Sequence, residues 1–127
     1  MKTIETLDLS SCKKLTKLNL SKTTVKRVIL PSKVKELVLP ETLETFELYN
    51  PVESITFEGL NNIQSVDLEN VGNLNVNQFL IDITNSTNLK SVTLRDIDIR
   101  VTEETLSKLL VTNFKTTGSI TVVDNSD

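Results

Sequence analysis

The apolar residues of this chain repeat one short pattern from Ile4 to Leu68. Each unit has an apolar residue, two polar residues, and then two apolar residues separated by one other, as in LTKLNL (15–20) and VKELVL (34–39). The units begin at Ile4, Leu15, Val25, Val34, Leu43, Val52 and Ile63. Their spacing of 9 to 11 residues is too short for a helix plus a strand, so each unit is predicted to hold one short strand and one corner.

Two units together make one coil of a solenoid, with a strand on each side of an aliphatic core. Every second strand should then join one long parallel sheet. The predicted strands of this sheet are residues 7–9, 28–30, 46–48, 66–68, 92–94 and 120–122. Strands 18–20, 37–39 and 55–57 should lie on the opposite side, followed by two helices. The predicted fold class is therefore an α/β repeat.

The pattern changes after Leu68. Val76, Phe79, Leu80 and Ile83 have the spacing of a helical apolar stripe, which predicts a helix at about 76–85. Asn75, followed by Gln78 three residues later, fits its N-terminal cap. Thr102 and two glutamates predict a second helix at about 103–113. The segment GSITVV predicts a last strand at about 119–123.

Composition narrows the classes of function. The 127 residues form a single domain, 1–127, with a net charge of −3 and no basic stripe for nucleic acid. No run is long enough to span a membrane. The chain has no histidine and one cysteine, so we expect no histidine-based catalysis, no metal site and no cofactor.

The segments IETLDLSSC (4–12) and LTKLNLSKT (15–23) resemble the leucine-rich repeat family. The early units are similar to the short repeats common in Bacteroidetes surface proteins. The segments TNLKSVTLRDIDI, LSKLL and TGSITV are similar to repeats of gut phage tail or fibre proteins. The resemblance implies a leucine-rich repeat solenoid that binds macromolecules through one sheet face and has no shared catalytic residues. Cys12 lies in the slot after LDLS that often holds Asn or Cys in this family, which implies that it packs as a small buried hydrophobe.

Alternation along the strands predicts which side chains the long sheet presents to solvent. The predicted binding residues on this face are Arg27, Glu47, Tyr49, Asp67, Glu69 and Arg95. Glu47 and Asp67 should be neighbours on adjacent strands, where like charges are mildly destabilising. We therefore expect either a solvated polar face or a surface that meets a basic partner.

The resulting hypothesis is a non-catalytic module that binds a protein or a glycan, in a bacterial surface protein or a phage virion protein. The alternative is a structural spacer or assembly domain of a fibre. A third alternative, a hydrolase, would need Glu47 and Asp67 about 5–5.5 Å apart in a cleft. Solenoid ends need polar caps, and the sequence offers none near Ile4 or at ITVV (120–123). We therefore expect this domain to be part of a longer polypeptide, or to self-associate through its end coils.

Overall fold

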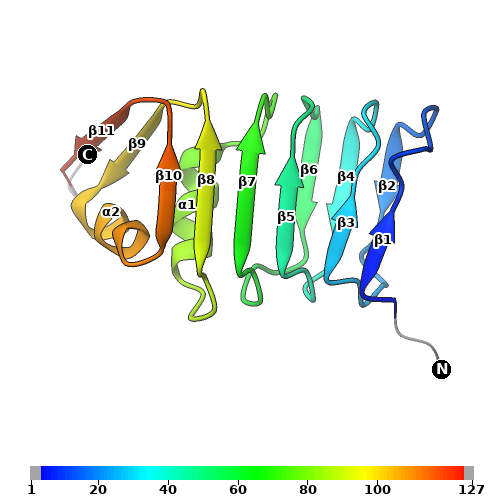
Figure 1. The fold of residues 1–127 in the computed structure, drawn as a ribbon, viewed down its shortest axis with the longest axis horizontal. Helices are drawn as coiled ribbons and strands as arrows, with labels where there is room; N and C mark the ends of the chain where they lie inside the picture. The colour runs from blue at the N-terminus through cyan, green and yellow to red at the C-terminus, as the bar shows by residue number, and fades with distance from the viewer. Residues whose placement is uncertain (1–3, 125–127) are drawn as a thin grey trace.

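In the computed structural model, which describes residues 4–124, the chain crosses repeatedly between two sides of one core (Figure 1). One side is a six-stranded sheet, hereafter the long sheet, with strand order β1-β3-β5-β7-β8-β10. Its strands are β1 (Thr6–Asp8), β3 (Arg27–Ile29), β5 (Thr45–Leu48), β7 (Ser65–Glu69), β8 (Ser91–Arg95) and β10 (Asn113–Thr116). All strand pairings in the described residues are parallel, so this is an α/β fold with parallel sheets and two helices.

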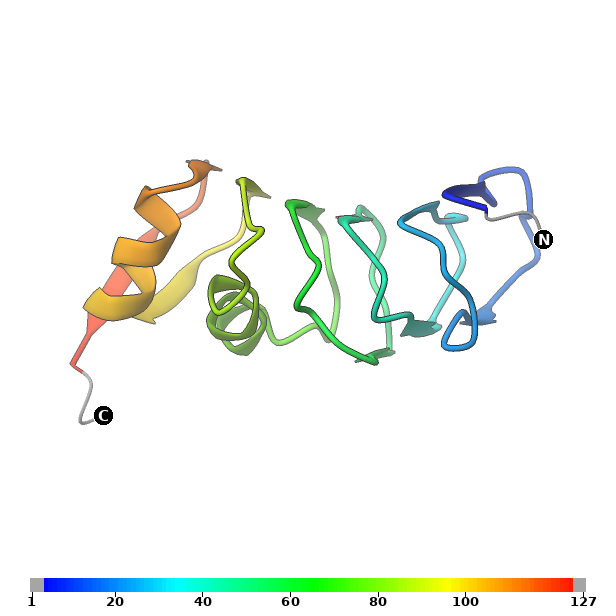
Figure 2. The ribbon, with the colours of Figure 1, turned by 90° about the horizontal axis from the view of Figure 1, so that it is seen from below.

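The opposite side of the core changes along the chain from strands alone to strands and helices (Figure 2). It begins as a three-stranded sheet of β2 (Lys17–Asn19), β4 (Glu36–Leu39) and β6 (Ser54–Phe57). Helix α1 (Val76–Thr84) then takes the place of a strand. Beyond it, β9 (Ile99–Thr102) pairs with β11 (Ile120–Val123), and α2 (Glu103–Leu110) runs between β9 and β10. The predicted strands of residues 4–68 are confirmed on both sides.

The last part of the long sheet differs from the prediction. Its sixth strand is β10, and the segment predicted for that place, 120–122, pairs with β9 on the opposite side instead. The second helix ends at Leu110 rather than at 113. In β10, Phe114 is the only large apolar residue, so this edge strand carries almost no apolar alternation. The free backbone edge of β8 is what draws it into the sheet.

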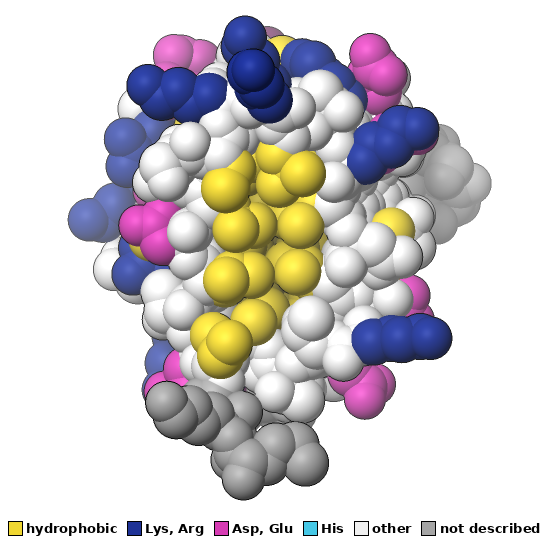
Figure 3. Space-filling view, turned by 90° about the vertical axis from the view of Figure 1, so that its right-hand side faces the viewer, with side chains coloured by type: hydrophobic (Ala, Val, Ile, Leu, Met, Phe, Trp, Pro, Cys, Tyr) yellow, Lys and Arg dark blue, Asp and Glu magenta, His cyan; other side chains and the backbone are white. Residues whose placement is uncertain are grey.

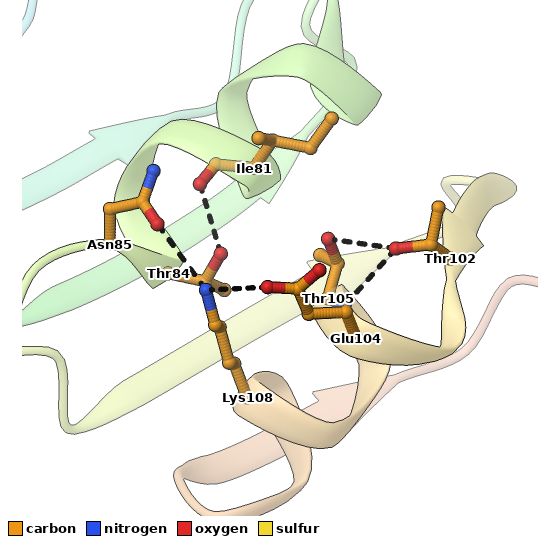
Figure 4. Close-up of polar contacts among 7 residues, drawn as sticks. All are labelled: Ile81, Thr84, Asn85, Thr102, Glu104, Thr105 and Lys108. Carbon is orange, nitrogen blue, oxygen red and sulfur yellow. Dashed lines mark hydrogen bonds and ion pairs between the residues drawn. The ribbon is translucent and has the colours of Figure 1, made fainter. Parts of the chain in front are cut away.

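Both helices begin at the predicted caps. The Asn75 side chain accepts a hydrogen bond from the Gln78 N–H at 3.2 Å, and Thr102 Oγ1 accepts one from the Thr105 N–H at 3.3 Å. Figure 4 shows where the two helices meet. There Lys108 Nζ, on α2, lies 3.3 Å from Asn85 Oδ1 at the end of α1 and 3.6 Å from Glu104 Oε1.

Apart from Phe114 of β10, which packs against the core separately, the aromatic residues of the core gather where the opposite side changes from strand to helix. Phe46 of the long sheet, Phe57 of β6 and Phe79 of α1 meet there, with ring centroids 5.2 to 5.6 Å apart. Phe46 and Phe79 are buried, with 0% and 3% of their surfaces exposed. The three rings are large enough to fill the wider space that a helix creates in place of a strand.

Each coil is tied to the one before it by a repeated hydrogen-bond pattern. Two successive N–H groups at the start of a strand donate to the same carbonyl of the preceding coil. Lys26 and Arg27, for example, donate to Glu5 O at 2.9 and 3.0 Å, and Glu44 and Thr45 donate to Lys26 O at 2.8 and 3.0 Å. Corner side chains add to this pattern, as when Asn62 Nδ2 donates to Glu41 O at 2.9 Å.

The exposure of Cys12 differs from the prediction. Cys12 is exposed, so the prediction that it is buried is wrong. It lies in the corner of the first coil, where no described residue precedes that coil to cover it. In the described part of the chain, no helix is long and apolar enough to cross a membrane.

Candidate functional site

The solvent-facing side chains of the long sheet form one continuous surface, hereafter the front face. The strand register aligns them in rows that cross the sheet. One row is Thr6, Arg27, Thr45, Ser65, Ser91 and Asn113. A second row contains Glu47, Asp67, Thr93 and Lys115. The segment predicted as the last strand of the long sheet, 120–122, does not contribute to this face, because it forms part of β11 on the opposite side.

The six predicted binding residues lie together on the front face. Arg27 comes from β3, Glu47 from β5, Asp67 and Glu69 from β7, and Arg95 from β8, while Tyr49 directly follows β5. These four strands are neighbours in the sheet. Asp67 is the direct partner of Glu47, and Arg95 that of Glu69, across the strand pairs. The structure therefore brings all six predicted residues, from four neighbouring strands, into one cluster.

The acidic pair at the centre of this cluster is paired with arginines of the same chain. Arg27 Nε donates to Glu47 Oε1 at 2.9 Å, and Arg95 Nη2 donates to Asp67 Oδ2 at 3.1 Å. The pKa of Arg27 is raised, first by this hydrogen bond and then by the charge of Glu47. Two cations thus offset the two adjacent anions, so the pair by itself gives no reason to expect a basic partner.

Tyr49 joins the two ion pairs. Its hydroxyl lies 3.0 Å from Asp67 Oδ2 and 3.3 Å from Glu47 Oε2. The phenol has one proton to donate, and the shorter distance favours Asp67 as its acceptor. Partial burial raises the pKa of Tyr49, and the hydrogen bond to Asp67 and the charges of both carboxylates raise it further. Tyr49 is still 42% exposed, so its ring is fixed in place and accessible.

Asp67 is held through one of its two oxygens. Oδ2 accepts from both Tyr49 and Arg95, whereas Oδ1 is buried and accepts no hydrogen bond from the described residues. Asp67 therefore links β5, β7 and β8 on the front face. The order of the resulting network is Arg27, Glu47, Tyr49, Asp67 and Arg95.

A hollow of about 110 Å³ lies beside Tyr49, at the ends of β3 and β5. Its apolar walls come from Ile29, Leu30, Pro31 and Val34. Sequence reasoning did not assign these residues to a site. The only available signal was that apolar residues, Ile29 to Pro31, follow Arg27 closely in the sequence. The hollow could hold a small apolar group next to the Tyr49 ring.

A second hollow, of about 380 Å³, lies on the opposite side between β6 and α1. Phe57, Leu60 and Phe79 line it together with side-chain amides. It contains one charged residue, Asp82, and no network comparable to that around Tyr49. The front face is therefore the better candidate for a specific site.

The front face does not present a cleft that both central carboxylates share. Glu47 and Asp67 are each engaged by an arginine, and the hollow is lined by Glu47 but not by Asp67. Among the residues described, no group of three or more histidine, cysteine, aspartate or glutamate side chains is placed to hold a metal ion. What this arrangement offers chemically is a fixed set of hydrogen-bonding groups around one accessible ring.

The chain matches no protein-family model, no curated protein and no solved structure. The site is therefore interpreted from its own residues.

Proposed function

We propose that this chain is a leucine-rich repeat solenoid whose front face is a non-catalytic binding surface for a protein, centred on Tyr49. The observation that carries the proposal is an exposed tyrosine beside an apolar hollow, with its hydroxyl bound to Asp67 and close to Glu47. An aromatic side chain that is already fixed loses little conformational entropy when a partner covers it. Tyrosine and arginine are also the residues most often found at the energetic centre of protein interfaces.

The repeat architecture supports the same proposal. The L-x-x-L-x-L units and the long parallel sheet are features that leucine-rich repeat proteins share, and these proteins mostly bind through a sheet face. The resemblance further implies a setting in a bacterial surface protein or a phage virion protein, and this setting is part of the proposal.

A peptide partner would place an apolar side chain in the hollow and cover the Tyr49 ring. The backbone and polar groups of the peptide would then meet Arg27 and Asn50, which line the same hollow. A glycan partner would instead stack on the ring and use the arginines and carboxylates. The apolar walls of Ile29, Pro31 and Val34 favour the peptide.

The test is a selection of displayed peptides against the wild-type chain, followed by affinity measurements with two variants. Tyr49→Ala should weaken the selected peptides about 30-fold, which corresponds to roughly 2 kcal/mol for a central tyrosine. Ile81→Ala is the matched control, because Ile81 is 43% exposed on α1 and away from the front face. Peptides that bind both variants as tightly as wild type would refute the proposal. Binding only to a glycan array, lost in Tyr49→Ala, would assign the face to glycans.

A further inference from the structure

The first coil of the solenoid has an apolar end that no described residue covers. Leu7, Leu9 and Leu18 are half-buried, whereas the paired residues one coil later, Val28 and Leu37, are each 1% exposed. Among the described residues, each inner coil has a neighbouring coil on both sides, whereas the first has one on a single side. Figure 3 shows the resulting apolar strip, with lysine and arginine side chains above it and on both sides.

The last coil has a corresponding apolar end. Ile120 and Val122 of β11 are 38% and 45% exposed. Their register partners on β9, Ile99 and Val101, are 2% and 3% exposed. Ile120 and Val122 therefore continue the rows of buried residues, with no described residue beyond them. Apolar core positions are thus exposed at both ends of the molecule.

Both ends also present free strand edges of matching direction. In the described residues, β1 pairs only with β3, and β10 pairs only with β8. All six strands of the long sheet are parallel. A second copy placed end to end, in the same orientation, would therefore set its β1 parallel to β10 and continue the same sheet.

The register across the sheet fixes which residues would meet at that joint. Thr6 and Asn113 belong to one continuous row. If the row continues into the next copy, Asn113 lies beside Thr6, and Lys115 lies beside Asp8 two residues later. Asp8 and Lys115 are both exposed, and neither takes part in a salt bridge between described residues.

The charges of the two ends are also complementary. Residues 4–24 contain four lysines and two acidic residues, a formal charge of +2. Residues 96–124, which follow β8, contain five acidic and three basic residues, a formal charge of −2. Contact between two N-terminal ends would bring like charges together, whereas contact between opposite ends brings unlike charges together.

We propose that the N-terminal end of this chain binds the C-terminal end of a second copy, head to tail, with β10 of one copy paired to β1 of the next. The apolar strip would cover Ile120, Val122 and the neighbouring core. Because this contact uses two different surfaces, it does not close on itself and would extend into longer assemblies. The inference does not depend on the proposed function of the front face.

The first experiment measures molecular mass against concentration by light scattering, for the 127-residue chain and two variants blocked at one end. The N-end variant carries Ile4→Glu and Cys12→Glu, and the C-end variant carries Ile120→Lys and Val122→Lys. All four residues are exposed, so both variants should fold, which circular dichroism would verify. Wild type should grow beyond a dimer, and each variant alone should stay monomeric. An equimolar mixture should form a dimer and stop, because each variant keeps one active end.

The second experiment tests the register through a charge exchange. Asp8→Lys alone and Lys115→Glu alone should each weaken association about fivefold, because each places two like charges side by side at the joint. The double variant should restore most of that loss. Ile81→Glu on α1 is the control and should associate as wild type does, because Ile81 lies at neither end.

Three results would overturn the proposal or its register. A wild-type chain that stays monomeric up to millimolar concentration has no such contact. Dimers that persist in the C-end variant but not in the N-end variant would show contact between two N-terminal ends instead. Association that the charge exchange leaves unchanged would overturn the pairing of Lys115 with Asp8.

Discussion

The Tyr49 hydroxyl lies 3.0 Å from Asp67 Oδ2, on the next strand of the long sheet. This one hydrogen bond crosses from the end of β5 to the middle of β7, and Arg95 of β8 binds the same oxygen. It fixes the ring of the only tyrosine in the chain while leaving the ring accessible. The front face is therefore ordered by its own side chains before any partner is present.

The ionisation of Tyr49 tests this relationship directly. The pKa of Tyr49 is raised above its ordinary value of 10.0 by partial burial, by the bond to Asp67 and by the two carboxylates. The chain has one tyrosine and no tryptophan, so phenolate absorbance reports Tyr49 alone. We expect a titration midpoint above 10.0 in the folded protein and a lower midpoint in Asp67→Asn.

The same shift predicts how stability depends on alkaline pH. A group whose pKa is raised on folding stabilises the protein fully below its unfolded pKa, and that contribution is lost as pH rises toward the folded value. The contribution of Tyr49 should therefore be complete below pH 10 and decline above it. In Tyr49→Phe the decline from this source should be absent. Equal alkaline losses in both proteins would contradict the assignment.

Phe79 should be one of the residues most important for stability. It is 3% exposed and packs against both Phe46 and Phe57, where α1 replaces a strand. Phe79→Ala removes a ring from a core that closes only partly around the gap, and should cost about 3–5 kcal/mol in the free energy of unfolding. Urea unfolding would measure this cost. Ile81→Ala, on the exposed side of the same helix, should cost no more than about 1 kcal/mol.

Gly72 is required by the backbone where the chain leaves β7. Its φ is +65°, and an added Cβ would lie 2.6 Å from Val52 O and 2.7 Å from Val52 N. Gly72→Ala should therefore destabilise the protein by about 1–3 kcal/mol in thermal or urea unfolding. Gly59→Ala is the control, since its nearest neighbour would be Glu41 Cβ at 3.3 Å. Equal effects of the two substitutions would contradict this interpretation.

Asp98 should make the last coil sensitive to acid. Its carboxylate accepts the Ser119 N–H at 2.9 Å, which joins the starts of β9 and β11, and this bond lowers the pKa of Asp98 below 3.8. A group with a lowered pKa stabilises the fold above its unfolded value and loses that contribution as pH falls through the folded value.

Asp98→Asn keeps a hydrogen-bond acceptor and removes the charge. We therefore expect the variant to be less stable than wild type at neutral pH, and the difference to disappear as the pH falls below 3.8. Urea unfolding across this pH range would measure it. Glu58→Gln, at an exposed position after β6, is the control. A difference between Asp98→Asn and wild type that is constant with pH would contradict the assignment.

Only part of the front face could be predicted from the sequence alone. Alternation along the strands predicted that Glu47 and Asp67 would be neighbours, and the register confirms it. It could not predict that Arg27 reaches Glu47 and that Arg95 reaches Asp67. Those contacts depend on side-chain rotamers and on the lateral offset of strands that lie about twenty or more residues apart in sequence. The hollow beside Tyr49 depends on the path of the Pro31 corner in the same way.

The sequence by itself determined the coils between Ile4 and Leu68 and both helix starts, because their apolar spacing and caps are local signals. Tertiary structure alone decided the end of the long sheet. The 113–116 segment has one large apolar residue, and it joins β8 because that strand offers unpaired backbone groups. The same principle explains Cys12. Its position in the repeat predicts burial, but burial requires neighbouring residues on both sides, and the described residues place a neighbour on only one side of Cys12.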